Sequence, residues 1–228
     1  MSMALPETRG PQRRERLRTA RLYFVCEALP GGREPEVVLH AALEGGVDIV
    51  QLREKELDRQ RVERSAQTFR RLCDIYGALF IVNDDPYLAQ SCNADGVHVG
   101  QDDMPAAEAR RILGPDAIIG LSTHSEEQLA AAAGEPVDYV SVGPIWETPT
   151  KEGRPGVGLD LVVHAAGAAP KPFFAIGGVD PSNAAEVVAT GARRLGVVRA
   201  IRDADDPAAA AEALRHALGG DGELAPGG

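Results

Sequence analysis

The sequence predicts an α/β protein that folds as a single-domain (β/α)₈ TIM barrel. Eight short apolar segments alternate with amphipathic or Ala-rich segments, which is typical of repeated βαβ units and a parallel sheet. Each apolar segment is nearly continuous, as expected for a strand buried on both faces. Eight such strands suit a closed barrel better than the alternative, an open doubly wound sheet. The length of 228 residues is ordinary for one domain of this kind.

The expected strands are short and rich in Val, Ile, Leu and Phe. They are LYFVC (22–26), DIVQL (48–52), ALFIV (78–82), GVHV (96–99), AIIGL (117–121), YVSV (139–142), FFAI (173–176) and LGVV (195–198). Helical patterns lie between them, several with Pro near the start and Gly at the end, where these residues favour helix initiation and termination. Examples of these patterns are residues 34–45, 58–77, 125–134 and 181–191.

The two ends of the chain fall outside this alternation. Residues 1–20 are rich in Arg and lack the apolar segment of a secretory signal peptide, so we expect a disordered basic arm. The barrel domain is expected over residues 21–218. Residues 219–228, GGDGELAPGG, show no periodic pattern and are expected to form a flexible tail.

Composition excludes several classes of partner. The formal net charge of −10 and a sequence pI of about 5.0 argue against nucleic acid. No apolar segment approaches the ~18 residues that a membrane span needs. Cys26, Cys73 and Cys92 are widely spaced and odd in number, which argues against a disulfide framework or a zinc site and favours the cytoplasm. We expect small-molecule substrates, and the sequence leaves a homo-oligomer open.

Polar residues follow seven of the eight expected strands. The strand ends run into REK, NDD, GQDD, STH, GPIWETPTK, GG and RA. In a (β/α)₈ barrel the active site assembles from the C-terminal ends of the strands and the loops after them. The sequence therefore predicts one site in which acids, basic residues and glycine backbone meet.

Gln51, Arg53 and Lys55 alternate along the chain and would point to one side if the second strand continued through them. That side is the inside of the barrel, where basic groups are costly unless an anion neutralises them. The pattern thus favours an anionic ligand. The alternative is a solvated loop in which the two basic groups pair with neighbouring acids, namely Glu54, Glu56 or Asp58.

Acidic residues follow the third and fourth strands and could meet at neighbouring strand ends. Asp85 precedes Pro86 and suits a helix N-cap, which leaves Asp84 as the better metal ligand beside Asp103. Mg²⁺ in proteins is typically held by one or two carboxylates, with waters and substrate phosphates as its other ligands. We therefore predict one Mg²⁺ at Asp84 and Asp103.

His98 and Ser122 lie on the fourth and fifth strands. A lone His on a strand is more often a packed, hydrogen-bonded residue than a catalyst, and we expect that role for His98. Ser122 is nearest the strand end and is expected to contact the ligand, whereas Ser125 resembles a helix start. No GxSxG segment surrounds Ser122, so covalent acyl chemistry is excluded.

Two further segments suit phosphate binding. The segment WETPTKEGRPGVG is long and polar, and Thr148, Thr150 and Lys151 are its donors, although an ordinary solvated loop would look similar. Gly177 and Gly178, with residues 198–199 after the eighth strand, occupy the place where many barrels bind phosphate through backbone N–H groups. A helix opening at Pro181 would add its dipole, whereas a plain turn is the alternative.

The segments QLREK, FIVNDD, DGVHVGQDD, GLSTH, VGPIWETPTK and AIGGV together resemble the thiamine phosphate synthases, in order and spacing over roughly residues 21–217. The resemblance implies transfer of a hydroxymethylpyrimidine from its diphosphate to the ring nitrogen of a thiazole phosphate, with release of diphosphate. It also implies catalytic roles for Arg53, Lys55, Lys151 and Ser122.

The resemblance divides the remaining residues between two substrates. For the pyrimidine diphosphate the implied contacts are Gln51, Leu52, Arg53, Glu54, Lys55, Asn83, Ser122 and Lys151. For the thiazole phosphate they are Thr148, Pro149, Thr150, Gly178, Val198 and Arg199, and Asp84 and Asp103 would hold Mg²⁺. The sequence departs from the family at Arg199, which stands where Ser is usual, so the role of that side chain is left open.

Two other functions are compatible with such a barrel. One is a related enzyme that isomerises a thiazole phosphate, a reaction that needs an acid or base but neither diphosphate nor metal. The other is a phosphate sensor without turnover. The sequence contains acids suited to a metal and basic residues suited to a diphosphate. These residues favour the synthase over the isomerase and over the sensor.

Overall fold

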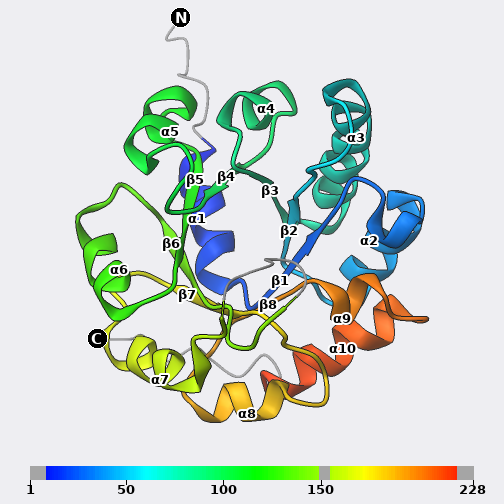
Figure 1. The fold of residues 1–228 in the computed structure, drawn as a ribbon. Coiled ribbons are helices and arrows are strands. Elements are labelled where there is room, and N and C mark those ends of the chain that lie inside the picture. Colours follow the sequence, from blue (N-terminus) through cyan, green and yellow to red (C-terminus); the bar gives the residue numbers. More distant parts are fainter. Residues whose placement is uncertain (1–8, 149–154, 220–228) are drawn as a thin grey trace, which may run out of the picture.

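The computed structural model describes residues 9–148 and 155–219, and in it eight parallel strands form a closed barrel, as expected (Figure 1). The strands follow one another around the barrel in chain order, and β8 pairs with β1 to close it. Their bounds are β1 Leu22–Cys26, β2 Ile49–Leu52, β3 Leu79–Asn83, β4 Gly96–Val99, β5 Ile118–Thr123, β6 Tyr139–Val142, β7 Phe173–Ile176 and β8 Leu195–Val197.

Helices surround the barrel on its outside (Figure 1). They are α2 Pro35–Glu44, α3 Arg59–Tyr76, α4 Pro86–Ser91, α5 Ala106–Leu113, α6 Glu126–Ala131, α7 Gly158–Ala168, α8 Ala184–Ala189, α9 Arg199–Arg202 and α10 Pro207–Ala217, with 3₁₀ turns at Pro30–Gly32 and Ala132–Gly134. The expected N-caps are confirmed: Asp85 accepts the N–H of Leu88, and Ser125 accepts that of Gln128. None of the described helices is long and apolar enough to cross a membrane.

Strand residues alternate between two apolar layers. Outward side chains such as Phe24, Val50 and Phe80 pack against the helices. Inward side chains, among them Tyr23, Tyr139 and Phe174, form a second cluster inside the barrel. The rings of these three residues have centroids 5.2–5.8 Å apart. The inward side chains of the strands therefore form a packed core inside the barrel.

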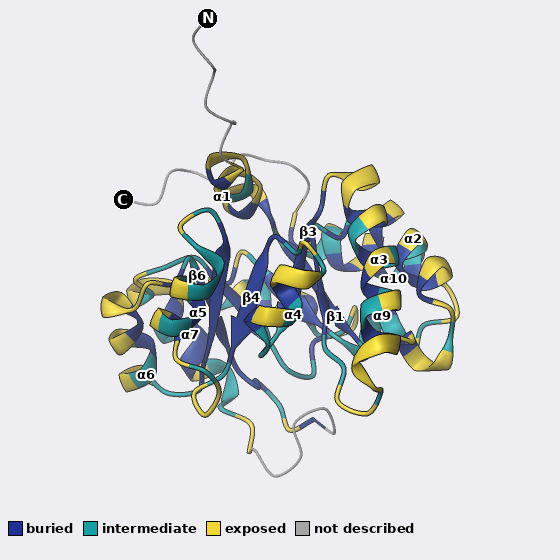
Figure 2. Ribbon diagram, turned by 90° about the horizontal axis from the view of Figure 1, so that it is seen from above, coloured by how far each residue is buried: buried dark blue, intermediate teal, exposed yellow. Residues whose placement is uncertain are grey.

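The N-terminal segment corrects one expectation from the sequence. Residues 10–19 form helix α1 (Gly10–Thr19), so the prediction of a disordered arm over residues 1–20 is wrong for this part, and residues 1–8 lie outside the described ranges. Leu17 and Ala20 are buried among the inward side chains of the strands. Helix α1 thus covers one end of the barrel (Figure 2).

The arginines that suggested a solvated arm are the residues that hold α1 in place. Arg13 Nε lies 2.8 Å from Asp95, the residue before β4, and Arg14 Nε lies 3.2 Å from Asp138, the residue before β6. Both acids lie at the N-terminal ends of strands. Local composition could not predict this, because the partners of the basic residues are about a hundred positions away in sequence.

Three aspartates with the same role reinforce this end of the barrel. Asp48, Asp95 and Asp138 precede β2, β4 and β6, and each accepts a backbone N–H from the strand before its own. The donors are Leu22, Phe80 and Ile119, and each aspartate also pairs with an arginine, namely Arg215, Arg70 and Arg110. These contacts serve stability and leave the other end of the barrel for a site.

Candidate active site

A cavity of about 630 Å³ lies at the C-terminal ends of the strands and is lined by residues from every strand or the loop after it. The predicted residues that line it are Gln51, Arg53, Lys55, Asn83, Asp84, Asp103, Ser122, Thr148, Gly178, Val198 and Arg199. Pro149, Thr150 and Lys151 lie outside the described residues. The polar strand ends therefore do converge on one site.

Leu52 and Glu54, also expected at the site, do not line the cavity. The Leu52 side chain is buried in the layer between strands and helices. The Glu54 carboxylate accepts the N–H groups of Ala28 at 3.1 Å and of Lys55 and Glu56 at 2.8 Å. These two side chains therefore shape the segment that carries Arg53 and Lys55 into the cavity wall.

Lys55 pairs with an acid from the next strand. Its Nζ lies 3.1 Å from Asp84 Oδ2, so the alternative in which Lys55 pairs with Glu54, Glu56 or Asp58 does not hold in this structure. Asp84 has φ of 62°, a left-handed conformation that few residues other than Gly adopt, although Asp and Asn tolerate it. Its N–H donates to the carbonyl of His98 at 2.8 Å, which ties this turn to β4.

Asp84 and Asp103 are brought together at the ends of β3 and β4. Burial, and then the adjacent Asp103 carboxylate, raise the pKa of Asp84, while Lys55 lowers it by less. One Asp103 oxygen accepts the N–H of Gly100 at 2.7 Å, which fixes that carboxylate. Two carboxylates facing each other repel when ionised, and a divalent cation between them would relieve that repulsion.

The donor set is compatible with Mg²⁺. Within residues 9–148 and 155–219 no group of three or more His, Cys, Asp and Glu is arranged to hold a metal ion. Two carboxylates leave most coordination positions to waters and phosphate oxygens, which is the usual environment of Mg²⁺ beside a phosphorylated substrate. Asp84 and Asp103 therefore fit a Mg²⁺ that is completed by its substrate.

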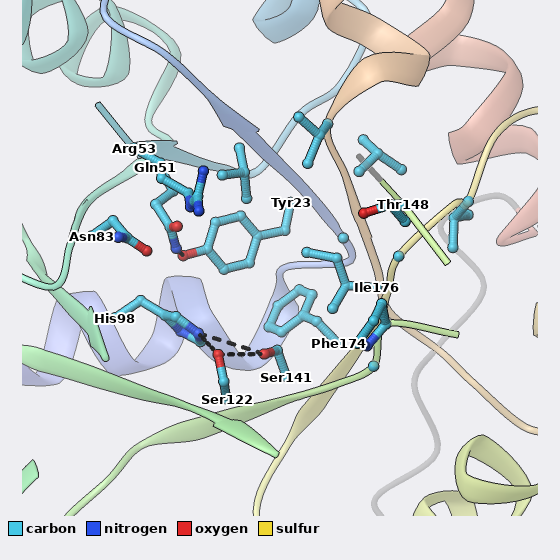
Figure 3. A pocket seen from close by; sticks show the side chains of 18 of the residues that line it. Tyr23, Gln51, Arg53, Asn83, His98, Ser122, Ser141, Thr148, Phe174 and Ile176 are labelled. Carbon is cyan, nitrogen blue, oxygen red and sulfur yellow. Dashed lines mark hydrogen bonds between the residues drawn. The ribbon is translucent and has the colours of Figure 1, made fainter. Parts of the chain in front are cut away.

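A row of buried polar side chains forms the floor of the cavity (Figure 3). His98 has hydrogen bonds to Tyr139 at 3.0 Å and Ser122 at 2.9 Å, so the expectation of a packed, hydrogen-bonded His98 is confirmed. Tyr23 and Tyr139 share a bond of 2.7 Å, and burial raises the pKa of both phenols. Neither tyrosine was expected from the sequence. Strand alternation could have placed them inside the barrel, but could not show that Tyr23 lines the cavity whereas Tyr139 does not.

Glycine backbone lines the opposite side of the cavity. Gly177 and Gly178 have φ of 108° and 73°, and a Cβ on Gly177 would lie 2.4 Å from Pro144 Cα. Only Gly fits such a close approach of two backbone segments, and a plain turn by itself would not require it. A Cβ on Gly178 would lie 3.1 Å from Trp146 Cβ.

The helix expected to begin at Pro181 begins at Ala184, which corrects the sequence prediction. Residues 181–183 instead form a turn held by Asn183, whose amide nitrogen donates to the Gly178 carbonyl at 2.9 Å and whose amide oxygen accepts the N–H of Asp180 at 2.9 Å. This turn fixes Gly178 without the helix. Across from it, Arg199 is the first residue of α9 and is exposed at the cavity wall.

A family model described as thiamine monophosphate synthase matches residues 22–201. The chain belongs to this family. The resemblance found in the sequence is thereby confirmed, and membership in the thiamine monophosphate synthase family makes the chain a transferase of thiamine biosynthesis.

Curated relatives agree with this assignment. The chain is 49% identical over 207 residues to the thiamine-phosphate synthase of Thermobifida fusca, covering 90% of this chain and 95% of the relative. It is 50% identical over 197 residues to that of Acidothermus cellulolyticus, covering 86% and 93%. Among solved structures, the thiamine phosphate pyrophosphorylase from Pyrococcus furiosus matches with a TM-score of 0.80 and 32% identity, covering 88% of this chain and 96% of that one.

Proposed function

We propose that the chain transfers 4-amino-2-methyl-5-hydroxymethylpyrimidine from its diphosphate to 4-methyl-5-(2-phosphoethyl)thiazole or its carboxylated form. The products are thiamine phosphate and diphosphate. One observation carries the proposal: a single cavity has cations and a carboxylate pair on its β2–β4 side and glycine backbone on its β7–β8 side. Such a cavity can hold two phosphorylated substrates with their rings between the two sides.

The β2–β4 side suits the diphosphate. Arg53 and Lys55 line the cavity there, and their charges would neutralise the leaving group, with Lys151 proposed as a third cation. Gln51, Asn83 and Ser122 would bind the rest of this substrate. When the bond between the methylene carbon and oxygen breaks, the electron pair leaves with diphosphate, and the electron-rich aminopyrimidine stabilises the cation that remains.

Asp84 and Asp103 would hold one Mg²⁺ on this side of the cavity. When bound, Mg²⁺ would neutralise charge that develops on the leaving diphosphate. Lys55 would then exchange its contact with Asp84 for one with the diphosphate, since the two groups pair at 3.1 Å in this structure.

The β7–β8 side suits the phosphate of the acceptor. Gly178 and Val198 offer backbone N–H groups, and the first N–H groups of α9, which begins at Arg199, have no acceptor inside a helix. Thr148, which is buried in the wall, would add a hydroxyl, and Pro149 and Thr150 are proposed as further contacts of the same phosphate. The thiazole nitrogen is already a nucleophile, so positioning replaces a general base.

The decisive experiment supplies the purified protein with the pyrimidine diphosphate, the thiazole phosphate and Mg²⁺. We expect equal amounts of thiamine phosphate and diphosphate, and no product with excess chelator. Product formation that excess chelator leaves unchanged would refute the metal assignment. Isomerisation of the thiazole phosphate alone would favour the isomerase, and binding of both compounds without product would favour a sensor.

Two variants distinguish a role of Arg53 in the site from a general effect of removing a positive charge. Arg53→Ala should lower kcat/KM by orders of magnitude because it removes a cation from the cavity wall. Arg59→Ala, on the exposed surface of α3 where Arg59 pairs with Glu63 and Asp85, should leave it unchanged. Equal losses in the two variants would exclude the assigned role of Arg53.

A further inference from the structure

A continuous row of hydrogen bonds links four side chains that line the cavity, through the buried Tyr139, which does not line it. The Gln51 amide nitrogen lies 2.6 Å from the Tyr23 hydroxyl, which lies 2.7 Å from the Tyr139 hydroxyl. Tyr139 in turn lies 3.0 Å from His98 Nδ1, and His98 Nε2 lies 2.9 Å from Ser122 Oγ. All five side chains are buried. Figure 3 shows Gln51 directed at the hydroxyl end of Tyr23 and His98 directed at Ser122.

One direction of hydrogen-bond donation gives each proton in this row an acceptor. The amide nitrogen of Gln51 can only donate, so the Tyr23 hydroxyl accepts from it. Among the described residues the Tyr23 hydroxyl is hydrogen-bonded to Gln51 and Tyr139, so its own proton is donated to Tyr139. If Tyr139 donated to Tyr23 instead, the Tyr23 proton would have no acceptor in this buried row, which is costly. Tyr139 therefore donates onward to His98 Nδ1.

The direction of the row sets the tautomer of His98. In a neutral imidazole one ring nitrogen accepts and the other carries the proton. Because Nδ1 accepts from Tyr139, Nε2 carries the proton and donates to Ser122 Oγ. Ser122 thus receives one hydrogen bond and keeps its own hydroxyl proton for another partner. In the reverse direction, Ser122 would donate to His98 and would turn lone pairs toward the cavity.

We propose that this row is a positioning device that keeps Ser122 a hydrogen-bond donor toward the departing diphosphate. The inference rests on the proposed function for the identity of that anion. Diphosphate oxygens only accept, so a Ser122 lone pair facing them would repel. Ser141 Oγ lies 3.5 Å from Ser122 Oγ, too far for a strong O–H···O bond, and therefore leaves the Ser122 proton to a closer acceptor. The row moves no proton and only orients the hydroxyl.

The first test reads the tautomer directly and needs no turnover. In protein labelled with ¹⁵N-histidine, two-bond ¹⁵N–¹H spectra distinguish the two tautomers, and His98→Gln identifies the His98 signals. We expect the Nε2–H form in the wild type and a shift toward a mixture in Tyr139→Phe, which keeps the ring but removes the donor to Nδ1. An Nδ1–H form in the wild type would overturn the proposal.

The second test asks whether Tyr139 acts through Ser122. We expect Ser122→Ala and Tyr139→Phe each to lower kcat about tenfold, and the double variant to lose little more, because residues that act as one unit are not additive. The KM for the thiazole phosphate should not change. Losses that multiply in the double variant would overturn the proposal, because the two residues would then act independently.

A matched control removes a similar hydroxyl elsewhere. Tyr76 Oη bonds to His40 Nδ1 at 2.8 Å on the exposed side of α2 and α3, and Tyr76→Phe should leave the kinetics and the His98 spectrum unchanged. A purely structural role of Tyr139 would lower the Tm of Tyr139→Phe while leaving the tautomer as in the wild type, which would also overturn the proposal. Wild-type protein that forms no thiamine phosphate would instead refute the proposed function, and the tautomer would still decide the direction of the row.

Discussion

The ammonium group of Lys55 lies 3.1 Å from the carboxylate of Asp84. In the proposed mechanism one of these groups binds diphosphate and the other binds Mg²⁺, yet in this structure they pair with each other. In that mechanism, binding of both ligands would exchange this ion pair for two new contacts. Since both side chains are partly exposed, the pair is weak enough to be exchanged at modest cost.

Lys55→Met should increase the affinity for Mg²⁺ alone about two- to fivefold, because it removes a cation that competes for Asp84. The same variant should lower turnover, because it also removes a contact with the leaving group. Titration calorimetry with Mg²⁺ measures the first effect. The control is Arg61→Met, which removes an exposed partner of Asp58 on α3 and should not change Mg²⁺ binding. Weaker Mg²⁺ binding by Lys55→Met would contradict the competition.

Asp84→Asn should raise the Tm of the metal-free protein by a few degrees at pH 7. Burial and Asp103 raise the pKa of Asp84, so the folded chain holds that proton more tightly than the unfolded chain and the ionised form costs stability at neutral pH. As the pH falls through the raised pKa, the wild type regains this stability and the difference shrinks.

Thermal unfolding in chelator at pH 7 and pH 4 measures the effect of Asp84→Asn. Asn also suits the left-handed backbone at this position, where φ is 62°. Asp84→Ala also removes the charge, but Ala tolerates the left-handed backbone less well than Asn does. This variant should therefore be about 1 kcal/mol less stable than Asp84→Asn. A lower Tm for Asp84→Asn than for the wild type would mean that the Lys55 contact outweighs the repulsion.

Gly178→Ala should raise the KM for the thiazole phosphate at least about tenfold and leave the KM for the pyrimidine diphosphate unchanged. The residue has φ of 73°, a conformation that Ala adopts only with strain, and a Cβ there would lie 3.1 Å from Trp146 Cβ, so Trp146 or the backbone would have to move by a few tenths of an ångström at the proposed phosphate site. A shift that costs about 1.4 kcal/mol of binding corresponds to tenfold. Steady-state kinetics with each substrate varied in turn measure this.

Gly77→Ala is the matched control for the glycine variant. Gly77 has a similar φ of 71° in the left-handed region after α3, but a Cβ there would meet nothing within 4 Å. Both variants should lose about 1–2 kcal/mol of stability from the left-handed backbone, and only Gly178→Ala should change the kinetics. Identical kinetic losses would show that backbone strain, and not the cavity, is responsible.

Leu17→Ala should lower the free energy of unfolding by about 2–4 kcal/mol, as expected for removal of a buried Leu side chain. Leu17 is 4% exposed and packs among the inward residues of the barrel. Arg16→Ala, on the exposed face of the same helix, should change stability by less than about 0.5 kcal/mol. Denaturant unfolding compares the two, and equal values would mean that α1 does not stabilise the barrel.

Much of the fold could be predicted because its signals are local. Strand positions follow from continuous apolar segments, and N-caps such as Asp85 follow from the residue and the Pro after it. A helix start without such a cap is not marked by the local sequence. Helix α8 begins at Ala184, not Pro181, because Asn183 bonds to Gly178 and Asp180. A turn of this kind depends on side-chain contacts that hydrophobic periodicity does not encode.

The sequence by itself determined the eight strands, their order and the set of polar residues at their C-terminal ends, because these depend on spacing along the chain. Only the tertiary structure decided which of those residues meet. Pairing of β2 with β3 places Lys55 beside Asp84, the barrel interior brings Tyr139 to His98, and α1 places Arg13 beside Asp95. These pairs join residues 29 to 82 positions apart. Their contacts depend on strand register and barrel closure, which no local pattern specifies.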